Sequence, residues 1–375
     1  MSVNYILYGA DISYFTGKAR AYLRYKDIPF EERPATREVY QEVIVPRVGW
    51  PVIPVIITPD DETLQDTSDI IDALESRYPD PSVYPEGPRQ RVVALLLEVY
   101  GDEWLKIPAM HYRWNHNSEW IIQEFGRLSR PELDAAAQRE VGERACRPFR
   151  GSLPVLGVTQ ATIPAVEASY EALLAELDAH FAEHEYLFGT RPSIGDFGLI
   201  GPLYAHQYRD PASGALMERL APNVVAWVKR MMDPAPCTGE FLSNDAVPDT
   251  VLPVLRRMMR EQLPVLNSTI NALAVWLDEH GEEEVPRGIG THQFTLERGT
   301  KYEVTGERTI FTFDQWMYQR PWDCYQALDD GARTRVRELL SSAGAGDALD
   351  RPLPRRVMRR HFKLVRERLG STATS

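Results

Sequence analysis

The chain has 375 residues and a formal net charge of −12, with 43% hydrophobic and 26% charged residues. This composition is typical of a soluble globular protein with two or three domains. The acidic balance argues against nucleic acid as a partner, because phosphate binding depends on clustered basic side chains. The N-terminus has no basic region and no long apolar run, so we expect neither a signal peptide nor a membrane span.

The three cysteines, Cys146, Cys237 and Cys324, lie far apart and form no CxxC or CxxH motif. This spacing indicates neither a disulfide framework nor a zinc site, and it fits a reducing cytoplasm, where we expect the protein. His180 and His184 have the i, i+4 spacing of a metal pair, but no adequate third ligand follows them. We therefore predict no metal site.

The first 80 residues alternate between short apolar strands and helices. In chain order we predict strand 4–9, helix 15–25, a strand after Pro29, helix 38–45, strand 52–57, strand 62–65 and a capped helix from Asp66. This β-α-β-α-β-β-α order predicts a small mixed sheet with helices on its faces.

A Pro-rich stretch at 78–89 has the composition of a linker, and the pattern then becomes helical. Helices are predicted at 89–106, 119–145, 164–184, 194–208 and 223–232. A second Pro-rich boundary near Asp233 opens a third region, with a helix pair at 250–279, a hairpin within 292–313 and a basic helix at 351–368. That last segment carries eight Lys and Arg against one Glu, which indicates a helix on an acidic body or, alternatively, an anionic partner surface.

The stretch ADISYFTGKAR places three hydroxyls, those of Ser13, Tyr14 and Thr16, at the start of the first helix. The free N–H groups and the dipole at a helix start suit an anion, either a phosphate or a thiolate. A hydroxyl there can donate to sulfur and lower the pKa of a thiol. The alternative is a plain N-cap, and Thr16 is the poorest ligand candidate because its hydroxyl can bond to its own helix.

Two further sites accompany this helix start. Pro54 lies in an apolar strand, where a cis peptide would accommodate it and expose the Val55 N–H and C=O to a peptide-like ligand. At the next helix start, Gln65-Asp66-Thr67-Ser68, the N–H groups and the hydroxyls can hold a carboxylate, while Asp66 can accept from an ammonium group. The alternative for this second helix is a cap without a ligand.

Three such sites in one β-α-β-α-β-β-α unit resemble the glutathione transferase family, whose N-terminal half is a thioredoxin-like domain. The segment LYGADISYFTGKARAYLRYKDIPFEE is similar to the family's first strand, active-site turn and helix. The resemblance puts Ser13 at the active-site serine or cysteine, with Tyr14 in reserve. It assigns glutathione binding to Pro54 as the cis-proline, to Val55 as the partner of the cysteine, and to Asp66 and Thr67 at the γ-glutamyl end.

The segment FGTRPSIGDFGLIGPL is similar to the family's C-terminal signature. In it Ser193 is the N-cap and Asp196 its reciprocal partner, a capping box that is structural rather than catalytic. We therefore predict a thioredoxin-like domain at 1–82, an all-α domain at 89–232, and a mainly α extension with a β-hairpin at 233–375. The extension has no counterpart in the family pattern.

The chain departs from the family at three positions near these sites. Tyr14 replaces a common proline, and Thr67 replaces serine. Trp50, followed by an additional proline, stands where a Lys or Gln often holds the glycine carboxylate of glutathione.

A pocket for a second substrate is predicted on the first long helix of the all-α domain. The candidates are His111, Tyr112, Arg113 and Trp114, which combine aromatic rings with a titratable imidazole and a cation. Pro108 would bend this helix toward the cleft. The alternative is a packed core without substrate contacts.

The resemblance implies an enzyme that uses glutathione as co-substrate and activates its thiolate for attack on a small electrophile. Conjugation, dehalogenation, ether cleavage and isomerisation all begin from that thiolate. A homodimer is the oligomeric state we consider. The alternative is a non-catalytic binding or scaffold protein on the same fold. In a third interpretation, the extension covers the cleft and restricts access to it.

Overall fold

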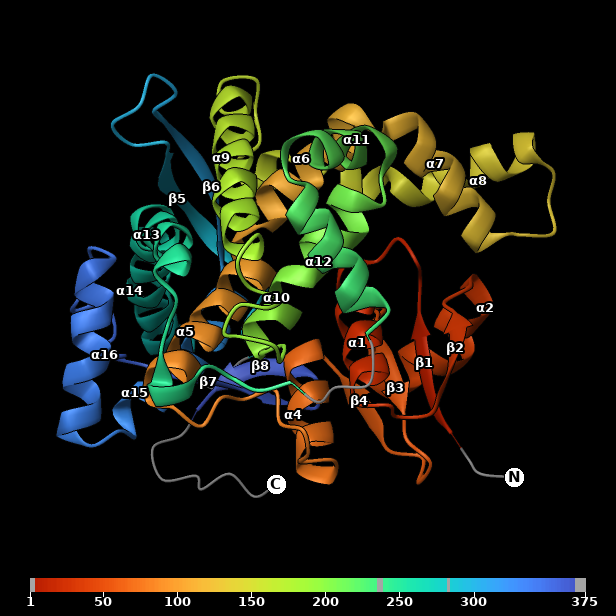
Figure 1. The fold of residues 1–375 in the computed structure, drawn as a ribbon. Coiled ribbons are helices and arrows are strands. Elements are labelled where there is room, and N and C mark those ends of the chain that lie inside the picture. The colour runs from red at the N-terminus through yellow and green to blue at the C-terminus, as the bar shows by residue number, and fades with distance from the viewer. Residues whose placement is uncertain (1–3, 235–238, 282–283, 368–375) are drawn as a thin grey trace.

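A four-stranded sheet with helices on its faces forms the first part of the chain (Figure 1), in a computed structural model that describes residues 4–234, 239–281 and 284–367. Its elements are β1 (Tyr5–Gly9), α1 (Tyr14–Tyr25), β2 (Phe30–Pro34), α2 (Arg37–Val39), η1 (Tyr40–Ile44), α3 (Val45–Val48), β3 (Val55–Ile57), β4 (Thr63–Gln65) and α4 (Thr67–Arg77). The strand order is β2-β1-β3-β4, with β1 parallel to β2 and antiparallel to β3. This is the predicted thioredoxin-like arrangement.

Apolar periodicity explains why this sheet forms. Strand β3 reads Val-Ile-Ile and is buried along its whole length, as expected for a central strand covered on both faces. Helix α1 buries Ala19, Tyr22 and Leu23 completely, and Leu7 of β1 is equally buried in the same core. The sheet is therefore a rigid base whose β3 and β4 ends carry the candidate site.

Helices make up the second part of the chain. They are α5 (Pro88–Val99), η2 (Tyr100–Trp104), α6 (Lys106–His116), α7 (Ser118–Ser129), α8 (Ala135–Arg150), α9 (Ile163–Phe181), α10 (Ile194–Pro202), η4 (Leu203–Tyr208), α11 (Pro211–Leu220) and α12 (Pro222–Met232). The single helix predicted at 119–145 is wrong. It divides into α7 and α8 around Pro131, which removes a backbone donor and disfavours helix in the residue before it.

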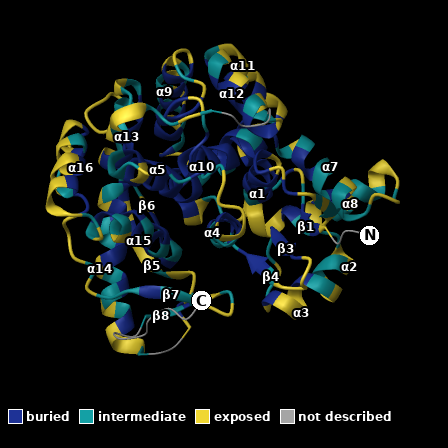
Figure 2. Cartoon of the chain, turned by 60° about the horizontal axis from the view of Figure 1, so that its bottom comes forward, coloured by how far each residue is buried: buried dark blue, intermediate teal, exposed yellow. Residues whose placement is uncertain are grey.

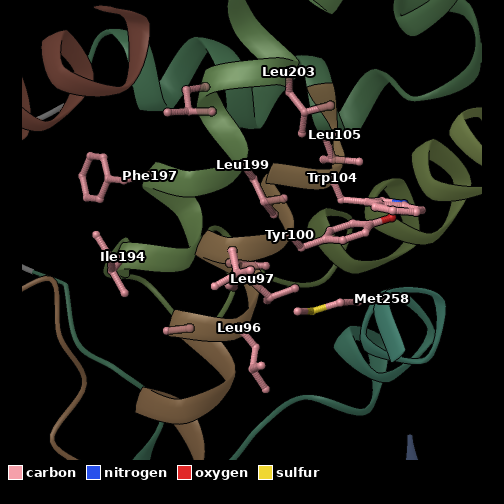
Figure 3. Packing of buried hydrophobic residues seen from close by; sticks show 14 of the residues in the cluster. Leu96, Leu97, Tyr100, Trp104, Leu105, Ile194, Phe197, Leu199, Leu203 and Met258 are labelled. Atoms are coloured by element: carbon pink, nitrogen blue, oxygen red, sulfur yellow. The ribbon is translucent and has the colours of Figure 1, made fainter. Parts of the chain in front are cut away.

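Two glycines bring α10 close to the α5–η2 segment. A Cβ at Gly101 would lie 2.3 Å from the carbonyl oxygen of Gly198, so a residue larger than glycine does not fit at this contact. Leu199 of α10 points toward Tyr100 and Leu97 at this contact, with Met258 of the C-terminal region nearby, whereas Phe197 points away from it (Figure 3). The burial map shows α5 and α10 at the centre of the molecule (Figure 2).

The C-terminal region begins with the predicted helix pair and hairpin. Its elements are α13 (Leu252–Glu261), α14 (Leu263–His280), β5 (Gly288–Leu296), β6 (Val304–Phe311), α15 (Thr312–Gln326), α16 (Asp330–Ser342), β7 (Val357–Arg360) and β8 (Lys363–Arg366). One hydrophobic cluster runs through all three parts and joins Leu23, Leu96, Met258 and Met317. The domain boundaries proposed above stay predictions, because the extension shares this core.

The basic helix predicted at 351–368 is wrong, because β7 and β8 form an antiparallel hairpin there. His361 and Phe362 at its turn both have positive φ, 48° and 62°, which is the backbone of a two-residue hairpin turn. Val357 and Leu364 face the Leu277 side of α14, so the period of the apolar positions is that of a strand. Several cations of this segment pair within the chain, among them Arg356 with Asp323 at 2.7 Å.

Two observations bear on compartment and redox state. In the described part of the chain no helix is long and apolar enough to cross a membrane. Cys146 is buried and Cys324 half-buried, and both are free thiols. Cys237 lies outside the described residues.

Candidate functional site

A cavity of about 510 Å³ lies between the β3–β4 end of the sheet and the C-terminal region. The first part of the chain lines it with Phe15, Gly49, Trp50, Val52, Ile53, Pro54, Gln65, Asp66 and Thr67. Glu103 and Lys106 come from the helical part. The C-terminal region contributes the opposite wall, including Glu284, Arg287, Phe311, Phe313, Arg359 and Lys363. The extension therefore builds half of the cavity, although no individual residue of this wall was predicted from the sequence.

The start of α1 separates the two candidate hydroxyls. Ser13 is half-buried and caps the helix, because its Oγ accepts the Thr16 N–H at 3.2 Å. Tyr14 is buried and donates its hydroxyl to the Gly101 carbonyl, and burial raises its pKa well above the usual value. Phe15 lines the cavity, whereas neither Ser13 nor Tyr14 does. Tyr14 is thus committed to packing, and Ser13 remains the hydroxyl that a ligand could reach.

At the proline site the cavity is lined by Ile53 and Pro54 and not by Val55, to which the resemblance assigned ligand pairing. The Ile53–Pro54 peptide is cis, and both residues line the cavity. Val55 is fully buried inside the sheet, opposite Tyr8 of β1 on one side and Gln65 of β4 on the other. Val55 thus pairs with strands on both sides, whereas Ile53 and Pro54 lie at the cavity.

The start of α4 combines a strained backbone with an unpaired hydroxyl. Asp66 has φ 75° and ψ 135°, a conformation that costs a non-glycine residue of the order of 1–3 kcal/mol. Its Oδ1 accepts the Ser68 N–H at 2.9 Å. Thr67 lines the cavity and is only 1% exposed, yet its Oγ1 has no hydrogen-bond partner among the described residues. Because Thr67 lines the cavity, its buried hydroxyl is free to bond with a ligand oxygen.

A buried charge cluster lies beneath this helix start. Lys18 donates to Glu98 at 2.8 Å and to Asp102 at 2.6 Å, and the Ser68 hydroxyl donates to Glu98 at 2.7 Å. Burial raises the pKa of Asp102 to about 7, although the Lys18 charge opposes that rise. The sequence analysis missed this cluster. The available signal was a lysine four residues before Tyr22, on the apolar face of the predicted helix.

Two arginines of the C-terminal region reach the sheet. Arg359 of β7 donates to the Gln65 carbonyl at 2.9 Å and bonds with the carboxylate of Asp69 on α4. Burial, and then the charge of Asp66, raises the pKa of Asp69 to about 7. Arg287 stacks on Trp50, with its guanidinium carbon 4.0 Å from the ring centroid. The wall that these residues form thus rests directly on the candidate ligand-binding elements.

The four residues predicted to line a second-substrate pocket lie elsewhere. His111, Tyr112, Arg113 and Trp114 are all at most 5% exposed, and none of them lines the cavity. Arg113 pairs with Asp210 through two hydrogen bonds of 2.7 and 2.9 Å and also donates to the Ile12 and Ala205 carbonyls. The correction follows from burial: this aromatic stretch holds α6 in the core. The second wall of the cavity is the C-terminal region instead.

Ser193 and Asp196 form the capping box at the start of α10. Asp196 accepts from the Ser193 N–H at 2.8 Å and also from the Leu187 N–H and the Trp227 ring N–H, each at 3.1 Å. Burial raises its pKa to about 6, while these donors oppose the rise. Both residues are fully buried, and their hydrogen bonds stabilise the start of α10.

One group of side chains has metal-ligand chemistry. Potential ligand atoms of His111, His116 and Glu167 lie within 4.8 Å of one another. Both imidazoles are 3.0 Å from the same Glu167 oxygen, and Asn115 bonds with the other ring nitrogen of His111. Burial lowers the pKa of His111, so a neutral ring that donates to Glu167 accounts for the contacts. The expectation of no metal stays a prediction.

A thioredoxin-like sheet, a following helical part and a cavity at the cis-proline edge together define the glutathione-transferase class of folds. Residues 7–82 match the glutathione S-transferase N-terminal domain, and residues 160–230 match the glutathione S-transferase C-terminal domain. The chain therefore carries regions similar to both domains of the glutathione S-transferase family, and its region beyond residue 230 is unmatched.

Solved structures that are similar to this chain have low sequence identity with it. β-Etherase LigF from Sphingobium sp. strain SYK-6 has 17% identity and a TM-score of 0.43, over 63% of this chain and 96% of that one. FzlA from C. crescentus has 17% identity and a TM-score of 0.39, over 66% and 97%. A glutathione S-transferase from Methylobacterium radiotolerans, in complex with glutathione sulfonate, has 19% identity and a TM-score of 0.39, over 65% and 100%. A search among curated proteins found no match.

Proposed function

We propose that this protein binds glutathione, or a closely related γ-glutamyl thiol, in the cavity between the sheet and the C-terminal region. The observation that carries the proposal is the unpaired, buried Thr67 hydroxyl at the start of α4, beside the cis Ile53–Pro54 peptide. The match of residues 7–82 to the glutathione S-transferase N-terminal domain supports it.

Each end of the site suits one part of such a ligand. The α-carboxylate of a γ-glutamyl group would accept from the Thr67 hydroxyl and from the N–H groups at the start of α4. Its ammonium group would pair with Asp66. The main chain at Ile53 would hydrogen-bond with the cysteinyl backbone in the manner of an added strand.

We further propose that the thiol then lies near Ser13 and the start of α1. The Ser13 hydroxyl and the helix dipole would stabilise the thiolate, which attacks a small electrophile. The site leaves open which electrophile that is. A homodimeric state and a cytoplasmic location remain predictions.

The second candidate function is ligand binding without catalysis. Ser13 does not line the cavity, although its O–H stays free to donate because the cap uses only an acceptor site of Oγ. The position of Ser13 outside the cavity lining favours a protein that binds the ligand without activating its thiol.

Two measurements on the full chain test these functions. Calorimetry with glutathione should give a dissociation constant below the millimolar range, and no heat at millimolar ligand would exclude both candidates in their glutathione form. Turnover of a chloronitroarene with glutathione then separates them. The enzyme loses this activity in Ser13→Ala, whereas a binding protein has none to lose.

A further inference from the structure

Most charges that line the cavity are paired. Lys106 contacts Glu103 at 2.6 Å, and Lys363 contacts Glu284 at 2.7 Å. Arg359 pairs with Asp69, as described above. Among the described lining residues, only Asp66 and Arg287 have no oppositely charged partner, and they do not pair with each other. The cavity thus offers one free anion and one free cation.

Arg287 is held in place although it has no carboxylate partner. Its guanidinium carbon lies over the Trp50 ring, 4.0 Å from the centroid, and this cation–π contact positions the charged group. Partial burial lowers the pKa of Arg287, and no neighbouring carboxylate opposes that shift. Its backbone carbonyl accepts the Thr312 N–H at 3.2 Å, so the main chain is anchored as well.

Trp50 adds a second unsatisfied donor at the same place. Its ring N–H is buried and has no hydrogen-bond partner among the described residues. Both Trp50 and Arg287 line the cavity. Arg287 is an exposed residue, so water satisfies its donors when no ligand is bound, whereas the Trp50 N–H is buried without a partner in the described part of the chain. A carboxylate at this place would accept from both groups, one of them charged.

We propose that Arg287 and the Trp50 ring N–H form a carboxylate-binding subsite that the C-terminal region supplies to the cavity. With Asp66 as the free anion, the cavity selects a dipolar ligand that carries an ammonium group at one end and a carboxylate at the other. This inference rests on the proposed function, and for glutathione it assigns the terminal glycine carboxylate to Arg287. Ligand binding then depends on a residue beyond the part of the chain that matches the family.

The test compares two ligands by calorimetry on the full chain: glutathione and its ethyl ester at the glycine carboxylate. Arg287→Gln should weaken glutathione binding at least tenfold and change ester binding less than twofold, because the ester has no terminal charge. Trp50→Phe keeps the stacked ring, loses the N–H, and should weaken glutathione about threefold. Arg298→Gln, at an exposed position outside the cavity lining, is the matched control and should change neither affinity.

The outcomes separate this inference from the proposed function. If wild type binds neither ligand, the proposed function fails and the subsite with it. If wild type binds glutathione but Arg287→Gln leaves that affinity unchanged, or weakens both ligands equally, only the subsite is refuted.

Discussion

At the residue scale, the Thr67 hydroxyl and the Ser13 hydroxyl differ in the hydrogen bonds that they make within the folded chain. Thr67 Oγ1 is buried without a partner, whereas Ser13 Oγ caps α1. The Thr67 hydroxyl thus adds no hydrogen bond within the described part of the folded chain, while the Ser13 cap has a structural role whether or not a ligand binds. Substitutions at the two positions should therefore separate stability from function in different ways.

Thr67→Val should weaken glutathione binding roughly tenfold and leave the free energy of unfolding unchanged or up to about 1 kcal/mol higher, since it removes an unsatisfied buried polar group. Urea unfolding and calorimetry measure the two quantities. Thr58→Val is the matched control, because the Thr58 hydroxyl accepts the Glu62 N–H at 3.1 Å. That control should lose about 1 kcal/mol. A Thr67→Val protein that is clearly destabilised would contradict this account.

Ser13→Ala should cost about 1 kcal/mol of stability through the lost cap and should raise the pKa of bound glutathione's thiol. Ser13→Asp distinguishes the two roles. Aspartate caps a helix as well as serine does, but its charge opposes a nearby thiolate. Stability should recover in Ser13→Asp while the thiolate absorbance in the ultraviolet stays low. Full thiolate formation in either variant would remove Ser13 from the mechanism.

At the element scale, the hairpin of β7 and β8 connects the C-terminal region to the sheet. Arg359 is 8% exposed at the side chain and bonds to Gln65 and Asp69, whereas Arg360 next to it is exposed. The two side chains point to opposite faces of one strand. The hairpin therefore depends on one arginine for its contact with α4.

Arg359→Gln should loosen the hairpin and lower the free energy of unfolding, because it removes the ion pair with Asp69. The loss should be only about 1–2 kcal/mol, because Asp69 is partly open to solvent, which screens the pair. Losing the Arg359 charge also removes the influence that lowers the Asp69 pKa, so more of that carboxyl is protonated at neutral pH. Hydrogen exchange should show faster exchange in β7 and β8, with Arg360→Gln unchanged. Equal protection in both variants would contradict the role given to Arg359.

The same scale shows what a sequence can predict. The strand and helix order of residues 4–77 follows from local apolar periodicity, and so do the hairpin of β5 and β6 and the pair α13 and α14. The prediction was wrong at the β7–β8 hairpin, because the many arginines of this segment obscure the two-residue period that is typical of a strand. The residues of the cavity's second wall could not be predicted. They lie more than 200 positions along the chain from the residues of the sheet that form the first wall, and non-local packing leaves no local sequence pattern.

At the scale of the whole molecule, buried histidines make stability depend on pH. His180 of α9 bonds with Thr250 at 2.8 Å and is fully buried, and burial lowers its pKa from 6.5 to about 4. Below pH 6.5 the unfolded chain therefore binds the proton more readily than the folded one. The stability contributed by the neutral ring is lost as pH falls from 6.5 toward 4.

His180→Gln should reduce this dependence. On acidification from about pH 7 to pH 5, wild type should lose about 2 kcal/mol more of its free energy of unfolding than the variant does. Buried carboxyls with raised pKa values, such as Asp102 and Asp196, act in the opposite direction in both proteins and cancel in the comparison. Urea unfolding at the two pH values measures it, with the exposed His280→Gln as control. Parallel curves for wild type and His180→Gln would refute the assignment.

The central claim is that the cavity shared by the sheet and the C-terminal region is a glutathione site. A crystal structure of the full chain with glutathione tests it most directly. The account predicts the γ-glutamyl carboxylate on Thr67, the cysteinyl backbone along Ile53, and the glycine carboxylate on Arg287. Glutathione bound outside this cavity, or absent from crystals grown at saturating ligand, would contradict it.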